Sequence, residues 1–283
     1  MNQADILEFP NDRPIRARLF TEASYGHHAK MHARLALWLI ESYSAAGDTI
    51  LDPMLGIGTS LLAALSQRDV VGYEVEPAFL AEAHRNAAKI IDAAGLLAGK
   101  ITVAAHDARA PWPHQADVVL FSPPYGCDAS GGVSRRRVIP EKLARLALLP
   151  GRRGARWKHL AGKLESGSMA SLLFHYGDHP AQLGHMRGAR YWQAMEQVYT
   201  QARAALRPGG KMVLVIKDHI RHGQRVTVAA DTAALCESLG FALIARHARR
   251  VWPLGLWQRK RKEQGKLIVE EEDVLVFTNG EQA

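Results

Sequence analysis

The sequence predicts an α/β protein built on a mostly parallel β-sheet, and two observations carry this prediction. From Thr49 onwards, short apolar runs alternate with longer segments whose apolar residues recur at spacings of three and four. This alternation is typical of strand–helix–strand units. The run at 211–218 has an all-apolar centre, which favours a strand buried on both faces. With 283 residues, 47% of them hydrophobic, the chain has ample material for a core around such a sheet.

Each element in turn has its own signal, either an apolar run or helical periodicity. The expected strands are 49–52, 70–74, 101–107, 116–122, 211–218, 241–248 and 269–278. The expected helices are 60–67, 77–94, 191–206 and 227–240. Pro208, Gly209 and Gly210 end the third helix. We expect a charged loop at 258–266 and, after it, a last strand that returns as a hairpin at the edge of the sheet.

The net charge of +8 lies in one segment of the chain. Between Cys127 and Arg190 there are twelve basic and four acidic residues, whereas the rest of the chain has 24 of each. A concentrated basic segment on a neutral body favours a polyanionic partner, and a solvated loop is the alternative. We therefore expect one α/β domain in two parts, 25–126 and 191–283, with an N-terminal extension at 1–24 and a basic insert at 127–190.

Composition excludes several classes of protein. No run of eighteen apolar residues and no secretory signal is present, so we expect a cytoplasmic protein without a membrane span. Two cysteines are too few for a disulfide framework or a thiolate metal site. Histidines such as His175, His179 and His185 lack a supporting ligand pattern, so we expect no metal.

The turn after the first strand is the first candidate binding element. It follows Asp52 and carries Gly56 and Gly58, which let the backbone pass close to a ligand at the carboxyl end of a strand. Leu61 stands where a dinucleotide-binding loop has its third glycine. The pattern therefore favours a nucleoside without a pyrophosphate.

Carboxylates follow at the ends of the next two strands. Glu74 can accept hydrogen bonds from both hydroxyls of a ribose, and we prefer it to Glu76 because Pro77 begins a helix immediately afterwards. Asp107 closes the third strand, where it can accept a hydrogen bond from an adenine amino group. Together with Asp52, three acidic residues thus stand at successive strand ends.

The run Ser122-Pro123-Pro124-Tyr125 after the fourth strand is the most specific signal in the chain. An exocyclic amino group is a poor nucleophile because its lone pair is delocalised into the ring. The Ser122 oxygen and the Pro123 carbonyl can accept its N–H groups and stabilise the positive charge that develops on nitrogen. The two prolines hold this backbone rigid, and Tyr125 can stack on a base that has been rotated out of a helix.

Taken together, these motifs resemble those of the DNA amino-methyltransferases, which make N4-methylcytosine and N6-methyladenine. The matching segments are LDPMLGIGT, GYEVEP, AAHDAR, FSPPYG and, upstream, HHAKMHARLALWLIESY. The resemblance implies S-adenosylmethionine as cofactor and the class I, Rossmann-like methyltransferase fold, a seven-stranded sheet whose last strand is antiparallel. The implied cofactor-binding residues are Lys30, Asp52, Pro53, Met54, Gly56, Gly58, Thr59, Glu74, Val75 and Asp107.

The resemblance also implies a substrate. Serine at the first position of the catalytic motif, Ser122 here, is associated in the family with N4 of cytosine, so we expect site-specific methylation of double-stranded DNA, with RNA as the alternative partner. The insert then serves target recognition, as in a restriction–modification methyltransferase. Its expected contacts to nucleic acid are Arg135, Arg136, Arg137, Arg152, Arg153, Arg156 and Lys158. A cognate endonuclease and the oligomeric state stay open.

Three other functions remain in competition. An N6-adenine DNA methyltransferase has the same chemistry. A transfer-RNA guanine-N2 methyltransferase uses a similar proline-proline-tyrosine motif, but usually with a separate RNA-binding domain, and only about 24 residues precede the cofactor helix here. A nucleic-acid binder that keeps the fold without catalysis is opposed by the intact Asp52, Glu74 and 122–125.

Overall fold

The computed structural model describes residues 5–27, 30–124, 148, 150, 179–251 and 256–279. Tyr125 and the seven basic residues predicted to contact nucleic acid lie outside the described residues. Within them, no helix is both long and apolar enough to cross a membrane.

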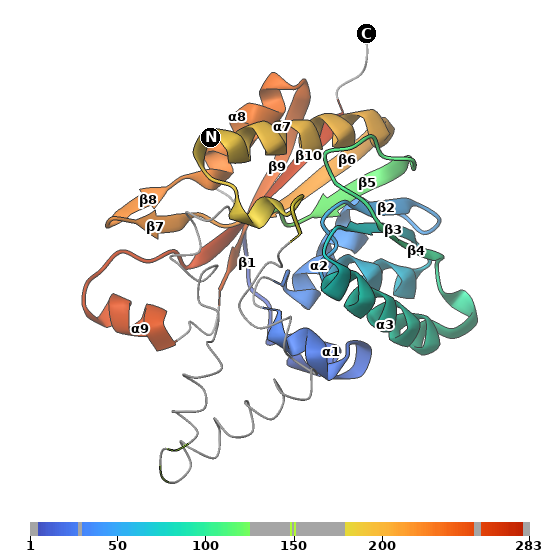
Figure 1. Ribbon diagram of the computed structural model, residues 1–283, viewed down its shortest axis with the longest axis horizontal. Coiled ribbons are helices and arrows are strands. Elements are labelled where there is room, and N and C mark those ends of the chain that lie inside the picture. Colours follow the sequence, from blue (N-terminus) through green and yellow to red (C-terminus); the bar gives the residue numbers. More distant parts are fainter. Residues whose placement is uncertain are drawn as a thin grey trace.

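The centre of the fold is an eight-stranded sheet (Figure 1). In spatial order its strands are β1 (Asp5–Leu7), β9 (Phe241–Arg250), β10 (Glu271–Asn279), β6 (Leu206–Ile216), β5 (Ala116–Phe121), β2 (Thr49–Asp52), β3 (Asp69–Glu74) and β4 (Ile101–Ala105). Strand β10 is antiparallel to both its neighbours, and the other pairs of the sheet are parallel. The predicted fold class is confirmed.

Two expectations about this sheet were wrong. Strand β10 lies between β6 and β9 and not at the edge. Its residues Val274 to Phe277 are at most 1% exposed, because side chains on both faces pack under helices. The sheet also has one strand more than expected, because β1, from the predicted N-terminal extension, pairs with His247–Arg249 of β9.

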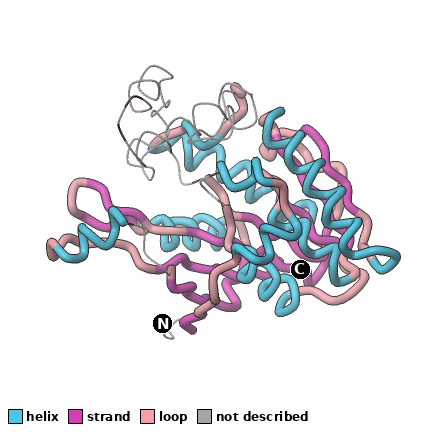
Figure 2. Tube along the Cα trace, turned by 90° about the horizontal axis from the view of Figure 1, so that it is seen from below, coloured by secondary structure: helices cyan, strands magenta, loops and turns pink. Residues whose placement is uncertain are grey.

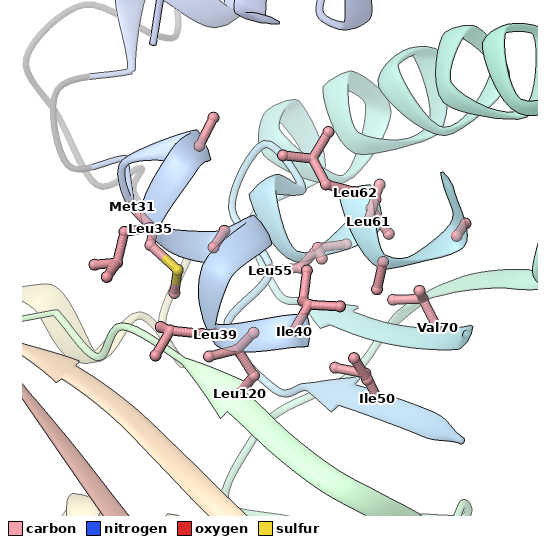
Figure 3. Close-up of a cluster of buried hydrophobic side chains, with 14 of the residues drawn as sticks. Met31, Leu35, Leu39, Ile40, Ile50, Leu55, Leu61, Leu62, Val70 and Leu120 are labelled. Carbon is pink, nitrogen blue, oxygen red and sulfur yellow. The ribbon is translucent and has the colours of Figure 1, made fainter. Parts of the chain in front are cut away.

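Helices cover both faces of the sheet (Figure 2). On one face, α2 (Ala33–Tyr43), the 3₁₀ helix η2 (Thr59–Ser66) and α3 (Pro77–Ala94) pack on Ile50, Val70 and Leu120, and Figure 3 shows how the leucines of α2 and η2 meet these strand residues. On the other face, α7 (Gly188–Ala205) and α8 (Val228–Ser238) pack on the alternate strand residues, such as Leu51 and Val119. The alternation of side chains along each strand thus supplies two apolar layers.

The remaining elements are short. They are α1 (Arg13–Leu19), η1 (Glu22–Gly26), η3 (Gly95–Leu97), η5 (Leu183–His185), β7 (His219–Arg221), β8 (Gln224–Val226) and α9 (Leu256–Glu263). Helix α9 replaces most of the charged loop expected at 258–266. Helix α7 begins at Gly188, three residues before the predicted start of this helix.

Candidate active site

The carboxyl ends of the central parallel strands open into one cavity. It is lined by twelve of the predicted residues, namely Lys30, Asp52, Pro53, Met54, Gly56, Thr59, Glu74, Val75, Asp107, Ser122, Pro123 and Pro124. These come from the segment before α2 and from the ends of β2, β3, β4 and β5. The structure therefore brings together the predicted cofactor-binding and catalytic residues that it describes, except Gly58, which is not part of the cavity lining.

The glycine loop between β2 and η2 has the left-handed backbone that its glycines predict. Gly56 has a φ of 56° and Gly58 one of 86°. A Cβ atom on Gly58 would stand 2.4 Å from Cδ1 of the buried Leu61. Gly58 therefore shapes the turn and contributes no cavity wall, whereas the amide of Gly56 faces the carboxylate of Glu74.

Glu74 is fixed in the wall by backbone amides. Its Oε2 accepts from the Gly56 amide at 2.7 Å, and its Oε1 accepts from the Glu76 amide at 2.8 Å. Burial raises the pKa of Glu74, although these amides favour the charged form. Glu76 is placed differently, because its Oε2 accepts from the amide of His179 at 3.1 Å and its side chain is not part of the cavity lining.

Asp52 is a second buried carboxyl group in the same wall. It accepts from the Met54 amide at 3.0 Å and from the Ser60 hydroxyl at 2.6 Å. Burial raises the pKa of Asp52 from an ordinary value of 3.8 to about 7. The nearby Glu74 carboxylate adds to this rise, whereas the two hydrogen bonds oppose it. A ligand that brings hydroxyl donors or positive charge would favour the ionised form of both acids.

Asp107 differs from these two acids because it already has a cationic partner. Arg109 donates to it from Nη2 at 2.6 Å and from Nε at 3.0 Å. Partial burial opposes the charge of Asp107, but the hydrogen bonds from Arg109 outweigh it and lower the pKa. Asp107 is thus held ionised and oriented at the cavity, where its carboxylate can act only as a hydrogen-bond acceptor.

Lys30 lies in the cavity lining before the start of α2. Its ammonium group donates to the carbonyl of His27. Burial lowers the pKa of Lys30 to about 8, and the nearby Arg16 contributes to the decrease. The His27 ring packs against Phe79 of α3 with centroids 4.6 Å apart. Phe79 is a lining residue that the sequence motifs did not indicate.

Ser122 follows β5 and is oriented by the neighbouring strand. Its hydroxyl donates to the carbonyl of Val215 in β6 at 2.9 Å. Because the only hydroxyl proton is used there, the Ser122 oxygen can act only as an acceptor towards a further donor. Ala181, Gln182 and Leu183 also line this cavity. They come from the far end of the basic segment, and no motif indicated them.

The strand order, with the antiparallel β10 between β6 and β9, defines the class I, Rossmann-like methyltransferase fold. No family model and no curated protein matches the chain. Several solved structures are similar to it. TrmN from Thermus thermophilus has 18% identity and a TM-score of 0.45, with 90% of this chain and 51% of that one covered. A methyltransferase from Pyrococcus furiosus has 14% identity and a TM-score of 0.49, with 95% and 94% covered.

A third similar structure is the N-methyltransferase NodS from Bradyrhizobium japonicum in complex with S-adenosyl-L-homocysteine. It has 11% identity and a TM-score of 0.49, with 96% of this chain and 100% of that one covered. The chain spans about half the length of TrmN. All three TM-scores are below 0.5, so the assignment of the fold rests on the strand order described above.

Proposed function

We propose that this chain is an S-adenosylmethionine-dependent methyltransferase that acts on N4 of cytosine in double-stranded DNA. The observation that supports the proposal best is the placement of the Ser122–Pro124 acceptors in the same cavity as Asp52, Glu74 and Asp107. A nucleoside-type donor and an amino-group acceptor then have adjoining sites at one edge of the sheet.

The donor site is assigned from the chemistry of its walls. Glu74 accepts from the ribose hydroxyls, Asp107 accepts from the adenine amino group, and Lys30 pairs with the methionine carboxylate. The left-handed turn at Gly56 lets the backbone approach the nucleoside closely. When bound, the cofactor supplies an electrophilic methyl group on a sulfonium ion, so the two buried acids next to it also favour its positive charge.

The acceptor site is assigned from the direction of the hydrogen bonds. The Ser122 hydroxyl donates to Val215, so its oxygen accepts an N–H of the target amino group. The Pro123 carbonyl accepts the second N–H, and proline has no N–H of its own to compete. Both acceptors favour the geometry in which the nitrogen lone pair points at the methyl donor, and they stabilise the positive charge on nitrogen during transfer.

The choice of DNA and of cytosine has separate support. The basic insert carries a net charge equal to that of the whole chain, as expected for a surface that contacts phosphates. Serine at position 122 supports cytosine through the resemblance to N4-cytosine enzymes. N6-methyladenine in DNA and N2-methylguanine in transfer RNA are the alternative products.

The proposal is tested by incubating the protein with labelled S-adenosylmethionine and either unmodified duplex DNA or transfer RNA, followed by digestion to nucleosides. We expect N4-methylcytosine from DNA. A product that is only N6-methyladenine or N2-methylguanine would overturn the substrate assignment. If the protein binds S-adenosylhomocysteine but forms no product from any nucleic acid, this would support a nucleic-acid-binding protein without catalysis.

A matched pair of variants tests the role of Ser122. We expect Ser122→Ala to lower kcat about 10²-fold without changing the affinity for S-adenosylhomocysteine, because the target N–H then has one acceptor fewer. The control is Ser66→Ala, since the Ser66 hydroxyl also donates to a backbone carbonyl, that of Ala63, but lies at the opposite end of η2 from the cavity. Equal kcat values for the two variants would contradict the role.

A further inference from the structure

The chain makes two excursions from the sheet edge that carries the cavity, in addition to the insert after β5. Strands β6 and β9 run in the same direction as β2, β3 and β5, because both are antiparallel to β10 and β6 is parallel to β5. The β7–β8 hairpin follows the carboxyl end of β6, and α9 follows the carboxyl end of β9. The hairpin and α9 both project from the left side of the molecule in Figure 1, and they lie on the same side in Figure 2.

The exposed side of the hairpin is basic. Arg221, His222 and Arg225 are exposed, and the hairpin residues 219–226 include no acidic residue. Arg225 pairs with Asp218 at 2.7 Å, and its side chain is still 46% exposed. The hairpin therefore presents guanidinium groups to solvent on a short two-stranded ribbon.

Helix α9 is more strongly basic. It carries Arg259, Lys260, Arg261 and Lys262 against one acid, Glu263. Lys262 pairs with Glu270 at 2.7 Å, but among the described residues Arg259 and Lys260 have no carboxylate partner and both are exposed.

The helix tolerates these cations where they stand. Lys260, Arg261 and Lys262 lie in the last turn of α9, where positive charge interacts favourably with the helix dipole, and Glu263 stands four residues after Arg259. At the opposite edge of the sheet, by contrast, Arg207 pairs with Asp117 at 2.6 Å. Among the described residues, Arg259 and Lys260 of α9 are thus exposed cations without a carboxylate partner on the side of the cavity.

We propose that the β7–β8 hairpin and α9 together form a second surface for double-stranded DNA, which contacts the phosphate backbone beside the active site. This rests on the proposed function and extends it beyond the insert at 127–190, to which the sequence alone assigned all contacts with nucleic acid. A two-stranded ribbon and an α-helix are both shapes that the major groove of a duplex admits. Arginine and lysine on such elements position a protein on DNA through phosphate contacts.

The test is the binding of a fluorescent 20-base-pair duplex by anisotropy, at several salt concentrations and with S-adenosylhomocysteine present. The two test variants are Arg259→Gln/Lys260→Gln and Arg221→Gln/Arg225→Gln. We expect each to weaken binding about 10-fold at 0.1 M salt and to reduce the slope of log K against log salt concentration by about 2, because each variant leaves two phosphates without a cationic partner. The control, Lys100→Gln/Lys211→Gln, removes the same charge from near the amino ends of β4 and β5, since Lys211 in the middle of β6 pairs with Val118, and it should bind like the wild type.

The outcomes separate this inference from the proposed function. Unchanged affinity for S-adenosylhomocysteine shows that a variant is folded. Test variants that match the control in affinity and slope overturn the second surface, even when the wild type methylates DNA. A wild type that binds S-adenosylhomocysteine but no duplex overturns both proposals. Tighter binding of transfer RNA than of the duplex, abolished in the same variants, would assign the surface to RNA and also overturn the inference.

Discussion

At the scale of single residues, the site is dominated by two carboxyl groups that share a wall. Asp52 and Glu74 are 4% and 6% exposed, and the pKa values of both are raised because burial disfavours their charge. Two such groups side by side cost folding free energy in the empty protein. A ligand with hydroxyl donors and a cationic centre offsets part of that cost, so the two buried acids favour the binding of such a ligand.

The raised pKa of Asp52 predicts how stability depends on pH. Because the pKa is about 7 in the folded chain against an ordinary 3.8, the folded state binds the proton more tightly, and stability falls as pH rises from about 4 to about 7. We expect the free energy of unfolding of the wild type to decrease by roughly 2–3 kcal/mol more than that of Asp52→Asn between pH 5 and pH 7. Urea unfolding at intervals of one pH unit measures this, and parallel curves for the two proteins would exclude it.

The sequence indicated these residues because strand ends are visible in it. Asp52 and Glu74 are the last residues of β2 and β3, and Asp107 lies two residues after β4. The carboxyl ends of parallel strands meet at one edge of the sheet. Phe79 and Gln182 had no such signal, since one reaches the cavity from a helix and the other from a segment 60 residues after Ser122. Only the packing of distant segments places them there.

At the scale of elements, the turn from β2 to η2 is a loop whose backbone packs closely against buried side chains. Gly58 is left-handed and tightly packed against Leu61, whereas Gly47, with a φ of 90°, has no neighbouring atom within 4 Å of a Cβ placed there. The two glycines have the same backbone requirement and different surroundings. A comparison of the two positions therefore distinguishes the cost of backbone strain from the cost of a packing clash.

Alanine at each of these positions should have a different cost. We expect Gly47→Ala to destabilise the protein by roughly 1–2 kcal/mol through backbone strain alone. Gly58→Ala should cost roughly 2–4 kcal/mol, because its Cβ also displaces the buried Leu61. Denaturant midpoints at constant slope give both values. If the two variants lose equal stability, Leu61 moves aside at no cost and the packing role of Gly58 is wrong.

Elements whose apolar residues repeat at a clear spacing could be predicted from the sequence, whereas a helix without such a spacing and the order of the strands could not. The helix at 77–94 was predicted to the residue, because its apolar positions repeat at helical spacing between a proline and a glycine. Helix α9 was missed because a run of four cations has no apolar face. Strand β10 was predicted but misplaced, since the order of strands in a sheet depends on pairing between distant segments.

At the scale of the whole molecule, the cavity is formed by segments from the first half and the later part of the chain. Lys30, Glu74 and Leu183 all line it, although the sequence separates the first from the last by more than 150 residues. A ligand bound there contacts several parts of the fold at once. Binding should therefore stabilise the entire domain against unfolding.

Thermal unfolding tests this together with the cofactor assignment. S-adenosylhomocysteine at about 100 times its Kd should add about 2.7 kcal/mol of stability and raise Tm by roughly 4–6 °C. At the same concentration, Glu74→Gln should show little shift because the ribose hydroxyls then lack their carboxylate acceptor. Glu76→Gln should keep the shift, since Glu76 bonds the His179 amide instead of lining the cavity. Equal shifts in both variants would contradict the assignment of Glu74.

The position of β10 also affects the order in which the fold can be completed during synthesis. Residues 271–279 are translated after every other strand of the sheet, yet they join β9 and β1 to the rest of it. Until they leave the ribosome, the inner edge of β6 lacks its partner, and β9 and β1 have no hydrogen-bonded link to the rest of the sheet. A nascent chain must therefore keep these exposed strand edges from associating with other chains until β10 has emerged to pair with both.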